Sequence, residues 1–241
     1  MGSDAPVPSG PFANTRFRFT SGVRAGEVVT IRDEAGATLL TYRSFASVVG
    51  IVGLVVSVII AVTGAAAVLF LLFESRPIPA IMALLLSAAF AVVIAMLVPP
   101  IHVTFYNDSS PVLHIAQEGN ITFPIASFLV GTPEERVIAR LRKTAWSRIG
   151  RNRWDILRAN DGRRIGSAIE ESLSRALLRK AAGKFNRRYE SNVRIRYFEK
   201  NVGWILRRPD ENGEVDVLDA AGDIDRRIAV ALATLILGSE P

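Results

Sequence analysis

Two long stretches without a charged residue dominate the hydrophobic pattern of the chain. They run from Ser44 to Phe73 and from Pro77 to Asn107, and His102 is the only titratable side chain in them besides tyrosine. About 20 apolar residues at a rise of about 1.5 Å cross a hydrocarbon core of roughly 30 Å, so each stretch is long enough to span a bilayer. Two buried helices of a soluble protein are the alternative, but runs of this length without one charge favour the membrane.

The pattern predicts a two-helix transmembrane hairpin, with helices over residues 44–74 and 80–100 and a short external turn at 75–79. The first stretch is about ten residues longer than a crossing requires, so its helix either tilts or begins outside the hydrocarbon, near Phe45. Neither apolar stretch places Asp, Glu, Lys or Arg at membrane depth. Transporters and channels usually need polar groups there, so the hairpin is predicted to be an anchor.

Each predicted helix carries a row of small residues spaced by four. The rows are Gly53, Ser57, Ala61 and Ala65 in the first helix, and Ala83, Ser87, Ala91 and Ala95 in the second. Residues i and i+4 share a helical face, and small faces allow helices to pack closely in lipid. The rows are therefore predicted to meet within one chain, or to form a homo-oligomer. The alternative is that Ala-rich helices produce such rows by chance.

Basic residues set the predicted orientation. Five precede the first helix, including Arg32 and Arg43, whereas the turn holds Arg76 alone. Because cytoplasmic segments near membrane helices are enriched in Lys and Arg, both termini are predicted to be cytoplasmic and the turn external. Arg far outnumbers Lys, which is typical of a GC-rich bacterium, so the expected location is the plasma membrane of a bacterium.

Elsewhere, alternating apolar segments flank turns that are rich in Asp, Asn or Gly. They run from Val28 to Tyr42 around Asp33–Gly36, from Val103 to Ile115 around Asn107–Ser110, from Trp154 to Ile169 around Asn160–Gly162, and more weakly from Val215 to Asp223. Gly and Asn tolerate positive φ and a period of two marks strands, so these are predicted β-hairpins. With further strand segments at 136–143 and 192–207, residues 15–43 and 101–241 are predicted to form one mainly β domain after a flexible tail at 1–14.

Two segments depart from the strand pattern. Residues 167–188 place Ile169, Leu173, Leu177 and Ala181 on one helical stripe beside basic residues, which predicts a basic amphipathic helix or a strand-to-helix transition. Residues 223–238 begin with Asp223 as a helix cap and are apolar on every side from Ile228 to Leu237, a run too short to span. A short helix of this kind must be enclosed by protein, and a curled β-sheet can enclose it.

Hairpins of the form apolar-x-apolar-x-Asp-x-x-Gly, followed by a C-terminal apolar helix, resemble the tubby C-terminal-like superfamily. The best example is Trp154-Asp155-Ile156-Leu157 with Asn160-Asp161-Gly162-Arg163-Arg164-Ile165-Gly166. That group includes LURP-one-related proteins and phospholipid scramblases. The resemblance covers roughly residues 15–42 and 102–238. It implies a closed barrel of about a dozen strands around the helix from Ile224 to Leu237. The chain departs from the pattern in its inserted transmembrane hairpin and in lacking the acidic cluster of a scramblase-like calcium site.

Composition excludes several kinds of chemistry. The chain has no cysteine, so disulfides, thiolate nucleophiles, Cys-bound zinc and iron–sulfur clusters are excluded. It also has no GxxxxGK[ST], GxSxG, HExxH or GxGxxG motif. The two histidines, His102 and His114, are predicted to lie far apart on extended chain unless a turn intervenes, and Glu170-Glu171 to favour a helix dipole. The sequence therefore predicts a non-enzymatic protein without a cofactor or a metal site.

A positive belt runs from Arg136 to Arg188, with sixteen basic residues against four acidic ones. Some of these lie near Trp146 and Trp154. The predicted lipid-binding residues are Arg148, Arg151, Arg153, Arg163, Arg164, Arg175, Arg179, Lys180, Lys184, Arg187 and Arg188. Beside the cytoplasmic leaflet each can contribute about 1 kcal/mol of attraction to anionic lipid. The belt also suits nucleic acid, but an anchor and the lack of a recognition motif disfavour that partner. A basic face that is merely solvated is the other alternative.

The leading hypothesis is a membrane-anchored binding or scaffolding module that engages anionic phospholipid, or a membrane partner, through this Arg-rich face. The alternative is a lipid-translocating protein of phospholipid scramblase type. That function would require an oligomer, because two apolar helices offer no polar path across the bilayer. An enzyme that acts on a membrane substrate is the third and least supported hypothesis.

Overall fold

The computed structural model describes residues 10–20, 26–43, 48–97, 100–119, 124–144, 147, 152–174, 191–207 and 215–238. The chain divides into two compact units. The barrel unit comprises Met1–Phe45, Ile101–Glu118 and Thr122–Pro241, and the helix unit comprises Ala46–Pro100 and Gly119–Ile121. The barrel unit is mainly β, as the hairpin pattern predicts.

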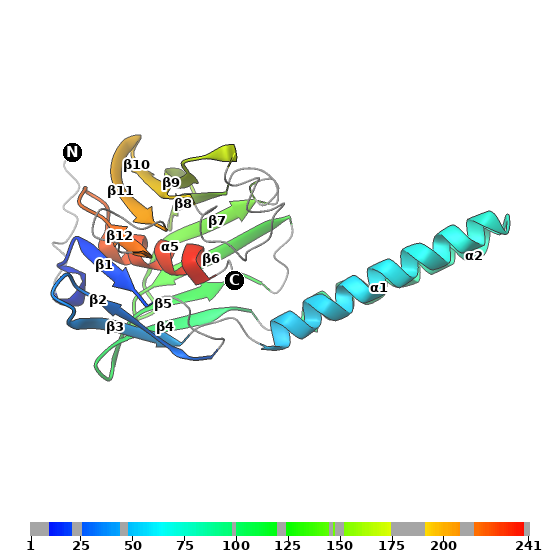
Figure 1. The fold of residues 1–241 in the computed structure, drawn as a ribbon, viewed down its shortest axis with the longest axis horizontal. Coiled ribbons are helices and arrows are strands. Elements are labelled where there is room, and N and C mark those ends of the chain that lie inside the picture. Colours follow the sequence, from blue (N-terminus) through cyan, green and yellow to red (C-terminus); the bar gives the residue numbers. More distant parts are fainter. Residues whose placement is uncertain are drawn as a thin grey trace. The chain divides into compact units, whose positions relative to one another are not determined.

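Twelve antiparallel strands in the described residues close into one barrel (Figure 1). They follow one another around the wall in chain order, and β12 pairs with β1, where Leu218 lies opposite Phe17. The strands are β1 (Arg16–Phe19), β2 (Val28–Arg32), β3 (Thr38–Arg43), β4 (His102–Asn107), β5 (Ser110–Gln117), β6 (Ile125–Gly131), β7 (Val137–Thr144), β8 (Arg153–Arg158), β9 (Arg164–Glu170), β10 (Val193–Tyr197), β11 (Lys200–Leu206) and β12 (Val217–Asp219). A short 3₁₀ helix, η1 (Gly10–Phe12), precedes β1. The predicted closed barrel is confirmed.

Alternation along the strands separates a dry interior from a charged outer wall. In β7, Leu141 is fully buried, whereas Arg140 and Arg142 on either side of it face outward. The same period of two places Phe17 and Phe105 inside. Successive strand residues point to opposite faces, so the alternating pattern in the sequence determines which side chains reach the core.

The β-hairpins form where turn chemistry permits them. Those between β2 and β3, β4 and β5, and β8 and β9 are confirmed. In the first, Asp33 Oδ1 accepts a hydrogen bond from the Ala37 N–H at 2.8 Å, and Gly36 has a φ of 86°. Glycine adopts this left-handed conformation readily because it lacks a Cβ.

One predicted element is wrong. Val215 to Asp223 is not a hairpin, because only Val217–Asp219 forms a strand and the chain then continues into helix α5 (Arg226–Gly238). Of the two forms predicted from Ser167, the described residues agree with the strand-to-helix transition: the chain is a strand as far as Glu170, because β9 pairs with β8 on one edge and with β10 on the other, and it is helical at Leu173 and Ser174. Ladder hydrogen bonds on two edges outweigh a helical side-chain period. Residues 175–188 lie outside the described residues.

Helix α5 fills the bore of the barrel (Figure 1). Its nine residues from Ile228 to Ile236 are all buried. A helix that is apolar on every side is stable here because strands surround it, which is the enclosure that the sequence predicts. The only hydroxyl among these nine belongs to Thr234, which lies beside Tyr42 of β3.

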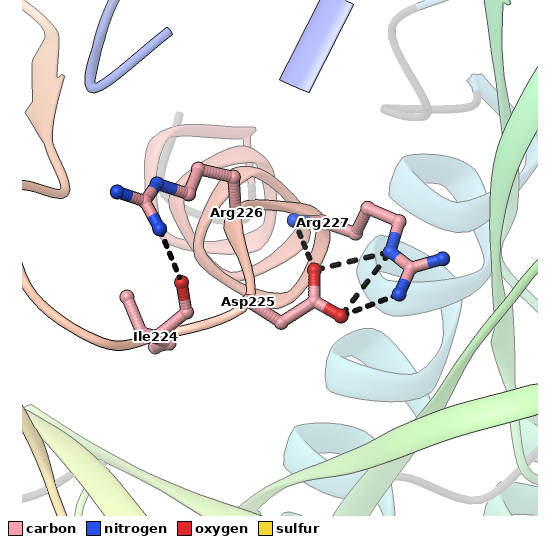
Figure 2. A network of polar contacts seen from close by, with 4 residues as sticks. All are labelled: Ile224, Asp225, Arg226 and Arg227. Atoms are coloured by element: carbon pink, nitrogen blue, oxygen red, sulfur yellow. Dashed lines mark hydrogen bonds and ion pairs between the residues drawn. The ribbon is translucent and has the colours of Figure 1, made fainter. Parts of the chain in front are cut away.

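The helix begins at Arg226, so its cap is Asp225 and not the predicted Asp223. Figure 2 shows Asp225 Oδ1 accepting from the Arg227 backbone N–H at 2.9 Å, while Arg227 Nη2 lies 2.6 Å from Oδ2. The carboxylate therefore satisfies a free amide of the first turn and holds the neighbouring guanidinium. These hydrogen bonds raise the pKa of Arg227.

Replacing Asp225 by Ala is expected to destabilise the barrel by about 1–2 kcal/mol, because the first turn of α5 loses its cap and the Arg227 side chain loses its partner. At roughly 2–4 °C per kcal/mol the melting temperature should fall by about 2–8 °C. All three tryptophans belong to the barrel unit, so tryptophan fluorescence follows its melting. Asp223→Ala is the matched control, since Asp223 is exposed. Equal losses in the two variants would contradict the assignment of the cap.

The helix unit consists of α1 (Val48–Phe73) and α2 (Pro77–Leu97), joined at Glu74–Arg76. Both helices lie within the predicted apolar stretches, with shifted ends, and residues 44–47 and 98–99 lie outside the described residues. The segment Pro77–Ile94 has 18 residues, a mean hydropathy of 2.4 and 6% of its residues buried, so it is long and apolar enough to cross a membrane. In α1, Ile59–Phe73 is a shorter apolar segment.

The two helices pack closely at a glycine. A Cβ built on Gly64 would lie 2.6 Å from Ser87 Cβ. In α2, the small residues Ala83 and Ser87 are half-buried as predicted, but Ala61 and Ala65 of the predicted α1 row are exposed and Gly64 is buried instead. The α1 row is therefore wrong at Ala61 and Ala65, whereas Ser57 is half-buried, and the burial of Gly53 lies outside the described residues. At Gly64 the missing side chain allows close packing of the two helices.

Candidate functional site

The two ends of the barrel carry different connections. At one end, which we call the turn end, short turns join β2–β3, β4–β5, β6–β7, β8–β9 and β10–β11. At the opposite end, which we call the insertion end, the chain connects β1–β2, β5–β6, β7–β8, β9–β10 and β11–β12. The helix unit is inserted between β3 and β4, so its chain connections also belong to the insertion end.

Apolar side chains of α5 and of the barrel wall form one core. Leu232 and Leu235 of α5 and Leu113, Leu141 and Ile156 of the wall are fully buried in it. Burial raises the pKa of Tyr42, whose hydroxyl lies beside Thr234. The charged groups of the barrel lie on its outer wall and at its ends.

Three arginines converge on one carboxylate on the outer wall. The Asp155 oxygens lie 3.1 Å from Arg153 Nη2, 3.7 Å from Arg142 Nη2 and 3.8 Å from Arg164 Nη1. These four residues, which we call the Asp155 cluster, come from β7, β8 and β9. Three positive charges and one negative charge leave the cluster with a net charge of +2. The arginine side chains are 37–49% exposed, so they can direct further N–H donors at a phosphate.

The cluster contains two of the predicted lipid-binding residues, Arg153 and Arg164. Arg163 lies instead in the β8–β9 turn, where its backbone N–H donates to Asp161 Oδ1 at 3.1 Å. The predicted residues that lie outside the described residues are Arg148, Arg151, Arg175, Arg179, Lys180, Lys184, Arg187 and Arg188. Sequence reasoning missed the roles of Arg142 and Asp155. Strand alternation places Asp155 on the same face as Arg153, but the position of Arg142 depends on the β7–β8 register, which no local pattern specifies.

Of the two tryptophans predicted to lie near these arginines, the structure describes only Trp154, and its ring does not lie on the outer wall. Trp154 is 2% exposed and packs inside against Phe128, with ring centroids 5.7 Å apart, and Lys143 Nζ lies 5.2 Å from the Trp154 centroid. Trp146 lies outside the described residues. On the outer wall, Arg194 of β10 stacks over Trp204 of β11 at 4.6 Å. An Arg–aromatic pair does occur on this surface, but on strands farther along the chain.

A polar network closes the insertion end where β8, β9, β10 and β11 meet. Glu170 is fully buried, and its Oε2 accepts from the Asn152 N–H at 3.0 Å. Asn192 Oδ1 accepts from the Arg207 N–H at 3.1 Å. The predicted helix-dipole role of Glu170 is wrong, because Glu170 is buried at the end of a strand; Glu171 pairs with Arg194 at 3.7 Å, two residues before the helical residue Leu173. These contacts fix backbone groups that the ladders leave free, which is a structural role.

A cavity of about 310 Å³ lies on the outer wall over β4 and β5. Its lining residues are His102, Thr104, Pro111, Leu113, His114, Ile115 and Pro133. The turn that the prediction allowed for does intervene, because the β4–β5 turn folds the two histidines onto neighbouring strands, with Thr104 directly opposite His114. The predicted hairpin from Val103 to Ile115 already contains the signal that brings them together.

These features define a class: a mainly β protein whose closed antiparallel barrel is filled by its C-terminal helix and interrupted by an apolar helix pair. Comparisons of the chain with protein-family models, with curated proteins and with solved structures found no match.

Proposed function

We propose that the helix unit spans a membrane and anchors the barrel, which engages anionic phospholipid, or a membrane partner, through its Arg-rich face. The observation that carries the anchor is the exposed apolar surface of α1 and α2. Large apolar side chains exposed by more than a third are Val56, Ile59, Val62, Leu69, Phe70, Leu72, Phe73, Ile78, Ile81, Met82, Leu84, Leu85, Leu86, Phe90, Val92 and Val93. Soluble monomers rarely expose apolar patches above a few hundred Å², and lipid would cover this surface.

The insertion end supports contact of the barrel with lipid headgroups. The chain enters and leaves the helix unit at this end. The connections at residues 145–152 and 171–192 belong to the same end, and together they carry eight basic residues and two acidic ones. Three exposed apolar side chains, Val28, Ile125 and Leu173, belong to the same end. Basic and apolar groups together suit the boundary between headgroups and acyl chains.

The Asp155 cluster supports anionic lipid as the ligand. A phosphodiester accepts hydrogen bonds from guanidinium groups in pairs, and Asp155 neutralises only one of the three arginines. Arg153 is the first residue of β8, at the insertion end. Nucleic acid would use the same donors, but the exposed apolar side chains at the insertion end favour a lipid surface.

A relationship to tubby-like proteins is part of this proposal. The closed barrel of twelve strands with α5 in its bore supports the relationship, because the resemblance implies that arrangement. Binding is preferred over scramblase-type translocation. The bore is filled, and α1 and α2 contain no charged residue that could line a polar path within one chain.

Phosphatidylglycerol is expected to bind the full-length chain more tightly than phosphatidylcholine, and the arginines of the Asp155 cluster should carry the difference. The test titrates the detergent-purified chain with short-chain forms of both lipids and follows tryptophan fluorescence. Removing three charges of about 1 kcal/mol each in Arg142→Gln/Arg153→Gln/Arg164→Gln should weaken phosphatidylglycerol binding at least tenfold.

A charge-matched control removes three arginines at the turn end, Arg16, Arg158 and Arg196, which pair with Glu34, Asp161 and Glu199. That variant has the same net charge, so a general electrostatic effect would lower its affinity equally. Equal affinities of the unaltered chain for the two lipids, or equal losses in the two triple variants, would refute lipid binding through the cluster.

A further inference from the structure

A row of outward-facing side chains crosses the barrel wall near the insertion end. Arg153 of β8 and Arg194 of β10 each lie opposite Ile169 of β9, one on either side of it. Trp204 of β11 lies opposite Arg194 and continues the row. The residues that flank each of these four in its own strand are buried, so the period of two directs the four side chains to the outer wall.

Trp204 and Glu171 position the Arg194 side chain. Arg194 Cζ lies 4.6 Å from the Trp204 ring centroid, and its Nη2 lies 3.7 Å from Oε1 of Glu171, which follows β9. These contacts on either side of β10 hold the guanidinium over its own strand, with 45% of the side chain exposed. A stacked guanidinium is pre-organised and keeps N–H groups for further acceptors. Together with the Asp155 cluster, four arginines and two carboxylates carry a net charge of +2.

The spacing of the row suits a ligand with two phosphates. One strand separates Arg153 from Arg194, so they lie two strand spacings apart, roughly 10 Å at the backbone. A hydrogen bond between a guanidinium and a phosphate oxygen is about 2.7–2.9 Å long. Where the guanidinium groups keep the strand spacing, two such contacts leave roughly 4–5 Å between the phosphate oxygens, which a three-carbon glycerol bridge spans. Ile169 lies between the two arginines and adds no charge.

We propose that the Asp155 cluster and Arg194 together bind an anionic lipid whose headgroup has two phosphodiesters joined by glycerol, which is the chemistry of cardiolipin. This inference rests on the proposed lipid binding and adds the class of lipid. One phosphate contacts the cluster and the other contacts Arg194. The second contact forms within a complex that already exists, so it raises the affinity without a stronger single site.

Cardiolipin is expected to bind the full-length chain at least tenfold more tightly than phosphatidylglycerol. The detergent-purified chain is titrated with short-chain forms of both lipids at equal phosphate concentration, and tryptophan fluorescence is followed. Arg194→Gln should lower the ratio of the two affinities at least fivefold, because the second phosphate loses its partner. Inorganic phosphate at the same concentration should not displace cardiolipin, since it has one phosphate alone. Displacement would mean that the ligand is a free anion and would overturn the lipid assignment.

Arg196→Gln is the matched control. Arg196 lies two residues from Arg194 on the same face of β10, and its side chain is 46% exposed. Its Nη2 lies 3.1 Å from Glu199 Oε2 in the β10–β11 turn, so the guanidinium is held at the turn end. Arg196→Gln removes the same charge from the same strand and should keep the preference for cardiolipin.

Two results overturn this inference alone. The first is equal affinity of the unaltered chain for cardiolipin and phosphatidylglycerol, and the second is an equal fall of the affinity ratio in Arg194→Gln and Arg196→Gln. Phosphatidylglycerol binding no tighter than phosphatidylcholine binding would refute the proposed function as well, so the two failures are distinguishable.

Discussion

Leu232→Asp is expected to prevent the barrel from folding. Leu232 is fully buried in the middle of α5. An ionised carboxylate without a partner costs several kcal/mol in such a place even after relaxation, and loss of the leucine packing costs about 2–5 kcal/mol more. Typical domains have only about 5–15 kcal/mol of stability in total. Near-ultraviolet circular dichroism and tryptophan fluorescence of the purified chain should both lose their native signals.

Two further variants separate the loss of leucine packing from the effect of a buried charge. Leu232→Ala removes the packing without adding a charge, so it should lower stability by about 2–5 kcal/mol and leave a cooperative melt. Leu237→Asp places the same charge at a half-buried position near the helix end, where water can reach it, and should cost less than Leu232→Asp. A native melting temperature for Leu232→Asp would mean that α5 does not fill the bore.

Features set by local chemistry could be predicted from the sequence. The turns around Asp33–Gly36 and Asn160–Gly162 contain their own backbone signals, and the strands beside them show their period directly. Helix α5 was predictable for a different reason. A run from Ile228 to Leu237 that is apolar on every side leaves no face for water, so enclosure is the only stable outcome.

Features set by contacts between distant segments could not be predicted in the same way. The cap is Asp225 because that carboxylate accepts from the free Arg227 amide in the first turn, and Asp223 two residues earlier has an equal local preference. Ser167–Glu170 has a helical period but forms a strand because β8 and β10 lie on either side. In α1, the abundant alanines concealed that Gly64 sets the helix contact.

The candidate sites also combine features that local sequence patterns predict with features that depend on contacts between distant segments. The sequence identifies a basic region and includes Arg153 and Arg164 in it. Their convergence with Arg142 on Asp155 depends on the register of three strands, which no local pattern specifies. The histidine pair was within reach of sequence reasoning, because the predicted hairpin around Asn107–Ser110 already folds His102 back beside His114. Such pairs can be predicted when each residue is placed on its predicted strand and the pairing of the strands is taken into account.

Labelling of single cysteines is expected to place the α1–α2 turn and the barrel on opposite sides of a membrane. The chain has no native cysteine, so each introduced thiol is unique. Arg76→Cys lies in the turn between α1 and α2, and Ala35→Cys lies in the exposed β2–β3 turn of the barrel. If α1 and α2 both cross, and Arg32 and Arg43 hold the N-terminal side in the cytoplasm, an impermeant maleimide added to intact cells should label only Arg76→Cys.

Permeabilised cells provide the control, because both thiols should then react, which shows that Ala35→Cys is accessible on the folded barrel. Alkaline carbonate should leave the chain in the membrane fraction, since the exposed apolar side chains of α1 and α2 would lose their lipid cover on release. Equal labelling of the two variants in intact cells would place the turn and the barrel on one side. Release by carbonate would contradict the proposal that the helix unit anchors the chain in a membrane. After either result, lipid binding by the Asp155 cluster would have to be explained without a membrane anchor.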